Sequence, residues 1–206
     1  MEHDAADTGA LRRAVLDGPV GGSSDFDLDP AVRAMLPEGR RLRAASVLIP
    51  VVERDGVLDV ILTKRASHLK HHAGQIAFPG GKVEVTDASP EAAALREAAE
   101  EIGLAPADVE MIGAIDPHET VTSFRIRPFV GLVAPGFTAR AQPGEVDEVF
   151  EVPLGFLMDP ANLQTHVRIW KGMRRSYYAI PYGPYYIWGA TARMLKALAD
   201  RLRAVQ

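Results

Sequence analysis

The sequence predicts an α/β domain, in which apolar strands alternate with helices. Residues 44–52 form a β-branched, apolar run typical of a buried strand, and residues 57–63 follow it across a turn as a hairpin partner. Residues 90–102 are rich in Ala, Leu and Glu, which favours a helix, and residues 188–204 have the pattern of a closing amphipathic helix. With 206 residues, of which 47% are hydrophobic and 24% charged, the chain suits one domain plus an extension.

The remaining elements are expected in chain order around these three. Residues 1–41 are predicted to be an N-terminal extension with two short helices and a linker rich in Gly, Ser and Asp, and residues 42–206 are predicted to be the domain. A short strand at residues 74–81 is expected to end in a sharp turn. Further strands are predicted at residues 109–115, 127–133, 148–152, 164–169 and 176–180, with a short helix at residues 153–158.

The composition excludes several classes of protein. Without cysteine the chain has no disulfide framework, no Cys–zinc site and no thiol nucleophile. A net charge of −4 argues against a general nucleic-acid binder. The N-terminus is acidic rather than signal-like, and the longest apolar runs are far shorter than the roughly 20 residues of a membrane span. We therefore expect a soluble, cytoplasmic protein with no nucleic-acid or membrane partner.

The helix at residues 90–102 carries the strongest chemical signal. Ser89 is a favourable N-cap and Gly103 a favourable C-terminal residue. Glu97 and Glu101 lie one helical turn apart, with Glu100 beside them, so three like charges gather within one turn. An acidic helix face is usually just solvated, but a hard divalent cation such as Mg²⁺ also suits such carboxylates. The glycine pair before the helix would let a backbone carbonyl approach the same cation, because glycine has no Cβ.

Residues 81–104 resemble the Nudix box, a glycine and a glutamate followed by Arg-Glu-apolar-x-Glu-Glu-x-Gly-apolar. The second half of the box matches position by position, whereas one extra residue lies between Gly81 and Arg96, and Asp87 stands where the family has its isolated glutamate. The resemblance implies an α/β/α sandwich with a mixed central sheet. It also implies a Mg²⁺ or Mn²⁺ site with Glu97, Glu100, Glu101 and the carbonyl of Gly81 as ligands, and Arg96 holding the glutamates in place.

Residues 61–81 are similar to the signature of one Nudix subfamily, the coenzyme A pyrophosphatases. The pattern is Leu-Leu-Thr-x-Arg-Ser/Ala, three residues, Arg, three residues, Gly, three residues and Phe-Pro-Gly-Gly; Lys70 replaces its second arginine. The extra residue in the box recurs in this subfamily, and Trp188 with Gly189 is similar to its Trp-Gly helix start. Coenzyme A carries a diphosphate and a 3′-phosphate, so positive side chains in this segment would favour it, although they could also be a basic rim that only aids solubility. The residues expected to bind substrate are Lys64, Arg65, Lys70, Gly74, Gln75 and Phe78.

The expected reaction is hydrolysis of the diphosphate of coenzyme A, or of a derivative, to 3′,5′-ADP and 4′-phosphopantetheine. The catalytic base stays open among Glu100, Glu145 and Glu148. Two alternatives are a Nudix hydrolase of another nucleotide, such as ADP-ribose or a dinucleoside polyphosphate, and a non-catalytic nucleotide sensor. The histidines at positions 68, 71 and 72 are not expected to form a metal site, and Trp188 either anchors the last helix or stacks on adenine. The partner is a small nucleotide, and a homodimer is compatible with the sequence.

Overall fold

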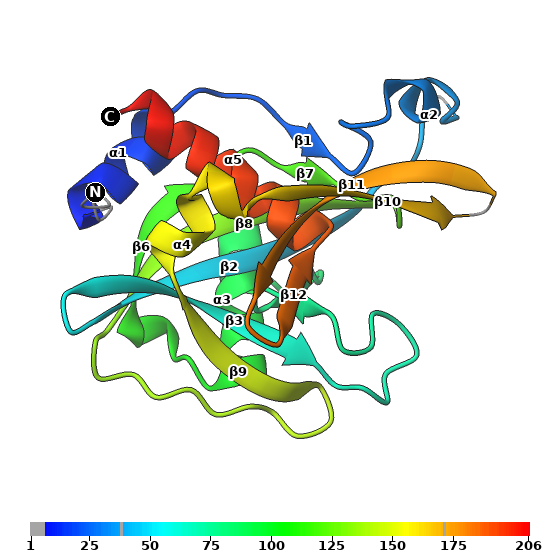
Figure 1. The fold of residues 1–206 in the computed structure, drawn as a ribbon. Helices are drawn as coiled ribbons and strands as arrows, with labels where there is room; N and C mark the ends of the chain where they lie inside the picture. Colours follow the sequence, from blue (N-terminus) through cyan, green and yellow to red (C-terminus); the bar gives the residue numbers. More distant parts are fainter. Residues whose placement is uncertain (1–6, 38, 171) are drawn as a thin grey trace.

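A large mixed sheet organises the protein, as a computed structural model that describes residues 7–37, 39–170 and 172–206 shows (Figure 1). Within these residues the sheet has nine strands, with the order β1-β7-β8-β2-β3-β4 and with β5, β6 and β9 paired to β2, β8 and β3. The central strands β2 and β8 are parallel, whereas β2 and β3 are antiparallel. The strands are β1 (Ser23–Ser24), β2 (Arg43–Arg54), β3 (Val57–Arg65), β4 (Ile76–Ala77), β5 (Gly80–Lys82), β6 (Val109–Ala114), β7 (His118–Glu119), β8 (Phe124–Val133) and β9 (Val146–Pro153).

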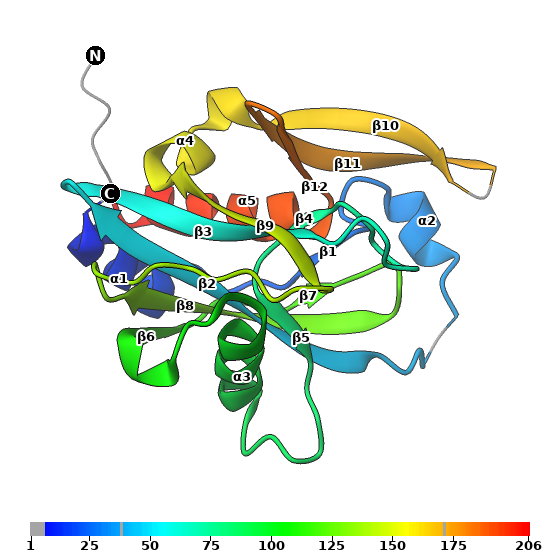
Figure 2. The same cartoon turned by 90° about the horizontal axis from the view of Figure 1, so that it is seen from below.

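Helices cover both faces of this sheet, as the sequence predicts for an α/β/α sandwich. Successive residues of β2 point to opposite faces, so Ile49 packs in the cluster beneath α5 (Ala190–Ala204) and Leu48 in the cluster beneath α3 (Pro90–Ile102). Figure 2 shows these two helices on opposite sides of β2 and β3. The other helices are α1 (Thr8–Asp17), α2 (Pro30–Ala34) and α4 (Leu154–Met158), with short 3₁₀ turns η1 (Pro106–Asp108) and η2 (Pro160–Asn162).

A separate antiparallel sheet is formed by β10 (Gln164–Trp170), β11 (Met173–Tyr182) and β12 (Tyr185–Trp188). The β10–β11 hairpin projects away from the main sheet toward α2 (Figure 1). The predicted closing helix began at residue 188, but the structure places Trp188 at the end of β12 and starts α5 at Ala190. The difference arises at Gly189, whose positive φ of 65° separates the strand from the helix.

The strand predicted at residues 74–81 is two short strands. Residues 76–77 pair with β3, while residues 80–82 pair with the neighbouring strand β2. Between them Pro79 has no backbone N–H with which to continue a ladder, so the chain changes partner at the turn. The turn brings Gly80 and Gly81 beside α3.

The predicted extension packs on the domain. Leu11, Ala14 and Val15 of α1 are buried in the same core cluster as residues of α5. Arg201 of α5 donates hydrogen bonds to the carbonyls of Ala14 and Val15, and β1 pairs with β7 as a parallel strand. The division of the chain at residue 42 stays a prediction, but α1 and β1 contribute to the sandwich. In the described part of the chain no helix is long and apolar enough to cross a membrane.

Candidate functional site

The helix α3 is held at both ends by the residues that the sequence predicts. The Ser89 hydroxyl accepts a hydrogen bond from the Ala92 N–H at 3.0 Å, and Gly103 ends the helix with a left-handed φ of 71°. This register turns Glu97 and Glu101 toward β5. Glu101 is only 4% exposed and accepts a hydrogen bond from the Gly80 N–H at 3.1 Å.

The glycine pair leaves room for this arrangement. A Cβ on Gly81 would lie 2.3 Å from Oε1 of Glu97, so the carboxylate occupies the space that a side chain would need. A Cβ on Gly80 would lie 2.5 Å from the carbonyl oxygen of Ser46, on the neighbouring strand. Each glycine therefore permits a different close approach, one to a carboxylate and one to the sheet.

Arg96 holds three carboxylates in place. Its guanidinium forms a two-pronged ion pair with Asp87, from Nε to Oδ1 at 2.9 Å and from Nη2 to Oδ2 at 3.2 Å. Its Nη1 contacts Glu97 and Glu100, both at 3.0 Å. The Asp87 carboxylate also accepts a hydrogen bond from the Glu84 N–H at 2.8 Å, which closes the loop before α3. Asp87 thus orients the arginine, in the position where the box has its isolated glutamate.

The site disfavours uncompensated negative charge. Burial raises the pKa of Glu101 to about 7, against the lowering effects of the Gly80 N–H and of Arg65, and the charges of Glu97 and Glu145 raise it further. Burial likewise raises the pKa of Glu97, and the charges of Glu100 and Glu145 add to this effect. Two desolvated carboxylates with nearby acidic groups fit a divalent cation, whose charge would relieve their repulsion. The donors are oxygens, which suits Mg²⁺ or Mn²⁺.

The predicted carboxylate ligands of the divalent cation do not form a complete ligand set in this structure. Within the described ranges, no three His, Asp or Glu side chains converge closely enough to hold an ion. Glu100 is exposed and its carboxylate pairs with Arg96, as given above. Glu145 is exposed in the loop before β9, and its charge acts on both the buried Glu101 and the half-buried Glu97.

A cavity of about 480 Å³ opens in front of the glycine pair. Arg65, at the end of β3, lines this cavity and lies 3.7 Å from Oε1 of Glu101. On one side the cavity is lined by the glycine pair and by residues of the signature segment, namely Arg65, Gln75, Phe78, Gly80 and Gly81. The opposite side is formed by the small sheet and the start of α5, with Arg168, Arg175, Tyr177, Trp188 and Arg193.

Comparison with known proteins identifies this arrangement. The NUDIX domain family model matches residues 41–176. A relative named "Uncharacterized Nudix hydrolase NudL", from Salmonella paratyphi B (strain ATCC BAA-1250 / SPB7), is 44% identical over 165 residues, which cover 80% of this chain and 85% of that protein. The chain belongs to the Nudix hydrolase family. The NudL protein of Salmonella newport (strain SL254) matches to the same extent.

Among solved structures, the Nudix hydrolase RenU from M. smegmatis is 20% identical, with a TM-score of 0.47. The match covers 54% of this chain and 71% of RenU. Membership in the family is sufficient to assign the general type of reaction. As a Nudix hydrolase, the protein cleaves a nucleoside diphosphate derivative, and enzymes of this family need a divalent cation.

The residues predicted to bind substrate lie in two places. Arg65, Gln75 and Phe78 line the 480 Å³ cavity of the Nudix site. Lys64 and Gly74 line a second cavity of about 370 Å³, which shares Gln75, Ile76 and Trp188 with the first. Lys70 is exposed and lines neither of these two cavities.

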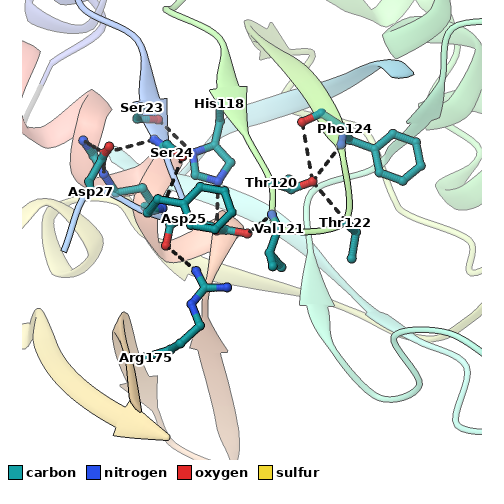
Figure 3. A network of polar contacts seen from close by, with 12 residues as sticks. Ser23, Ser24, Asp25, Asp27, His118, Thr120, Val121, Thr122, Phe124 and Arg175 are labelled. Atoms are coloured by element: carbon teal, nitrogen blue, oxygen red, sulfur yellow. Dashed lines mark hydrogen bonds and ion pairs between the residues drawn. The ribbon is translucent and has the colours of Figure 1, made fainter. Parts of the chain in front are cut away.

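The N-terminal segment supplies cavity residues that the sequence does not indicate. Ser24 and Asp25 line the cavity together with Thr120, Val121 and Thr122 from the β7–β8 turn. A buried polar network holds these two segments together (Figure 3). Nδ1 of His118 contacts the Ser23 hydroxyl at 2.9 Å, and Nε2 contacts Asp25 at 3.1 Å.

Asp25 links this network to the small sheet. Its carboxylate also accepts a hydrogen bond from the Val121 N–H at 2.8 Å, and its backbone carbonyl accepts one from Arg175 at 2.8 Å. The only signal of this docking in the sequence is a run of Ser and Asp residues, which is also typical of a linker. Long-range partners such as Arg175 are invisible to a local pattern.

Proposed function

We propose that this Nudix hydrolase cleaves the diphosphate of coenzyme A, or of an acyl or oxidised derivative, to 3′,5′-ADP and 4′-phosphopantetheine. The proposal is supported by residues 61–81, which resemble the coenzyme A pyrophosphatase signature. The observation that carries it is the position of Arg65, because this signature residue lines the cavity and lies 3.7 Å from the box glutamate Glu101. The signature and the Nudix box therefore contribute to one site.

In this proposal Glu97, Glu100, Glu101 and the carbonyl of Gly81 hold the divalent cation. When bound, the cation neutralises charge on the diphosphate and lowers the pKa of a bound water. Arg65 is placed to attract a diphosphate oxygen, because its positive side chain lines the cavity beside the glycine pair. Arg96 keeps the glutamates in position through its contacts with Asp87 and Glu97.

We assign the catalytic base to Glu145. Of the other candidates, Glu148 accepts a hydrogen bond from the Tyr185 hydroxyl, and Glu100 pairs with Arg96. Glu145 is exposed, and its charge already reaches Glu97 and Glu101. The base removes a proton from the attacking water, a new P–O bond forms, and the bridging P–O bond of the diphosphate breaks.

The base assignment is tested by replacing one carboxylate at a time. We expect Glu145→Gln to lower kcat about 100-fold or more with little change in the affinity for Mn²⁺, since general-base catalysis contributes about 10²–10⁴-fold. Glu148→Gln is the matched control and should leave kcat within a few-fold of the wild type. If Glu148→Gln gives the larger loss, the assignment is wrong.

The substrate proposal is tested by a side-by-side panel. Coenzyme A, ADP-ribose and a dinucleoside polyphosphate are compared at equal Mg²⁺ or Mn²⁺, with products identified by chromatography and mass spectrometry. We expect kcat/KM to be highest for coenzyme A, and Glu101→Gln to remove turnover of every substrate. Turnover of coenzyme A no better than that of ADP-ribose would contradict the substrate. Unchanged turnover in Glu101→Gln would contradict the proposed metal site and indicate that catalysis takes place elsewhere on the protein.

A further inference from the structure

The wall of the cavity opposite the Nudix box is basic and aromatic. It is formed by the face of the small sheet on which His166, Arg168, Arg175, Tyr177 and Trp188 lie, since these residues alternate along their strands and face one another across them. All of them except His166 line the 480 Å³ cavity. Neither the family match nor the coenzyme A signature assigns a role to the two arginines of this wall.

Arg168 is the centre of a stacked cluster. Its guanidinium carbon lies 4.6 Å from the ring centroid of Trp188 and 5.8 Å from that of Tyr177. The two rings meet edge to face, with centroids 5.3 Å apart. The guanidinium lies over both rings in cation–π contacts, which leave N–H groups that can donate to a phosphate. Within the described ranges Arg168 forms no ion pair.

A second arginine strengthens the positive charge at this wall. Arg168 is directly opposite Arg175 in the β10–β11 register. Two positive side chains therefore lie at paired positions on this wall, where both can attract a phosphate. Arg175 is 5% exposed, and its guanidinium is held over the ring of Phe26 at 4.7 Å and hydrogen-bonded to the Asp25 carbonyl. Arg175 is thus fixed, while Arg168 lies at the surface of the cavity.

The lysines of the signature segment are less well placed for a second phosphate. Lys64 faces Glu148 in the β3–β9 register and lines the smaller cavity. Lys70 lines neither cavity. The positive side chains that share a cavity with the glycine pair, apart from Arg65, include Arg168 and Arg175 on the opposite wall.

We propose that Arg168, stacked on Trp188 and Tyr177 and opposite Arg175, forms a specificity subsite that binds the 3′-phosphate of the substrate's nucleoside, with the adjacent rings contacting the base. This inference rests on the proposed function, since it concerns the end of the substrate away from the scissile diphosphate. Arg168 is a binding residue here, and the chemistry of the diphosphate stays at the Nudix box.

The subsite is tested by binding, without turnover or metal. Isothermal titration compares 3′,5′-ADP with 5′-AMP, which differ only in the 3′-phosphate. A charge-assisted contact contributes about 1.5–3 kcal/mol, so we expect wild type to bind 3′,5′-ADP about tenfold or more tightly than 5′-AMP. Arg168→Met should remove most of this preference while leaving the affinity for 5′-AMP within a few-fold.

Arg174→Met is the matched control. Arg174 is exposed, lies on β11 next to Arg175, and is absent from the lining of both cavities. Arg174→Met removes the same charge as Arg168→Met but at a position outside the cavities. The variant should therefore retain the preference for 3′,5′-ADP over 5′-AMP. A wild type that binds 3′,5′-ADP no more tightly than 5′-AMP, or an Arg168→Met variant that keeps the full preference, overturns the subsite.

A kinetic comparison separates this inference from the proposed reaction. With coenzyme A and 3′-dephospho-coenzyme A as substrates, Arg168→Met should reduce the ratio of their kcat/KM values about tenfold or more, whereas Arg174→Met should leave this ratio unchanged. Absence of coenzyme A hydrolysis, together with an Arg168-dependent preference for 3′,5′-ADP, would contradict the reaction and keep the subsite. If Arg168→Met hydrolyses coenzyme A with an unchanged ratio of the two kcat/KM values, the result would contradict the subsite and keep the proposed reaction.

Discussion

The contact between Gly81 and Glu97 offers a way to displace one carboxylate of the Nudix site without disturbing the sheet. The Cβ of an alanine at position 81 would lie 2.3 Å from Oε1, 2.5 Å from Cδ and 2.7 Å from Oε2 of Glu97. All three atoms belong to the end of a flexible side chain, so the carboxylate yields rather than the strand. To reach an ordinary contact of about 3.4 Å, the near oxygen must move by about 1 Å.

The expected effect of Gly81→Ala on catalysis is large. A misplacement of about 1 Å can lower a rate about 100-fold, and we expect kcat/KM to fall by this order with saturating Mg²⁺. The free energy of unfolding should change by less than about 1 kcal/mol, because replacing glycine in a compatible backbone conformation stabilises by only about 0.4–1 kcal/mol. Steady-state kinetics and urea denaturation measure the two quantities on the same preparation.

Gly80→Ala is the control, and we expect it to lower the stability of the fold, whereas Gly81→Ala lowers activity. Its Cβ would meet backbone atoms, the Ser46 carbonyl oxygen at 2.5 Å and the Val47 Cα at 2.7 Å, which cannot rotate away. We expect a loss of about 1–3 kcal/mol of stability, as for overpacked interiors. If Gly81→Ala retains full turnover, or is destabilised as much as Gly80→Ala, the reasoning about the Glu97 contact is refuted.

Three further changes test the surroundings of the site. Asp87→Asn breaks the charged clamp on the box arginine, so we expect the affinity for Mn²⁺, measured by titration, to fall about 10–100-fold, whereas unchanged affinity would contradict an orienting role. Burial alone would raise the pKa of Asp25, but the hydrogen bond with His118 holds it below its ordinary value of 3.8. A lowered folded-state pKa gives stability that is present above pH 3.8 and lost as the pH falls through the folded value. Asp25→Asn should therefore make the free energy of unfolding in urea less dependent on pH below 3.8, and an unaltered profile would argue against this role of Asp25. Glu145→Gln should lower the pKa of Glu101 in the metal-free protein from about 7, because one repelling charge is removed, and carboxyl NMR titration would show no shift if the two side chains lay far apart.

The Nudix helix is predictable because every signal for it is local. The cap at Ser89, the left-handed Gly103 and the helical spacing of Glu97 and Glu101 all lie within residues 89–103. Helical geometry alone places the two glutamates on one face. The glycine pair before the helix predicts the approach of a backbone carbonyl to a cation, which stays a prediction, and the structure adds the close approach of Gly81 to Glu97.

The parts that sequence reasoning misplaces depend on distant partners. An apolar stretch at residues 74–81 indicates a strand, but only the positions of β2 and β3 decide that it splits between them. A Gly- and Ser-rich run before residue 30 has the composition of a linker. It docks because His118 and Arg175, 93 and 150 residues away in the chain, satisfy the polar groups of Asp25.

The residues expected to carry the chemistry are held mainly by local contacts, whereas the wall expected to select the nucleotide is held by distant ones. The carboxylates of the Nudix box are oriented by Arg96, whose contacts with Asp87, Glu97 and Glu100 span at most 9 residues. The opposite wall of the cavity is joined to the N-terminal segment by contacts that span 150 residues or more, from Arg175 to Asp25 and from Arg193 to Asp27. Changes in the N-terminal segment can therefore move the basic wall while leaving α3 and its carboxylates in place. For this reason, variation in residues 23–29 should alter which nucleotide is preferred before it alters whether a diphosphate is cleaved.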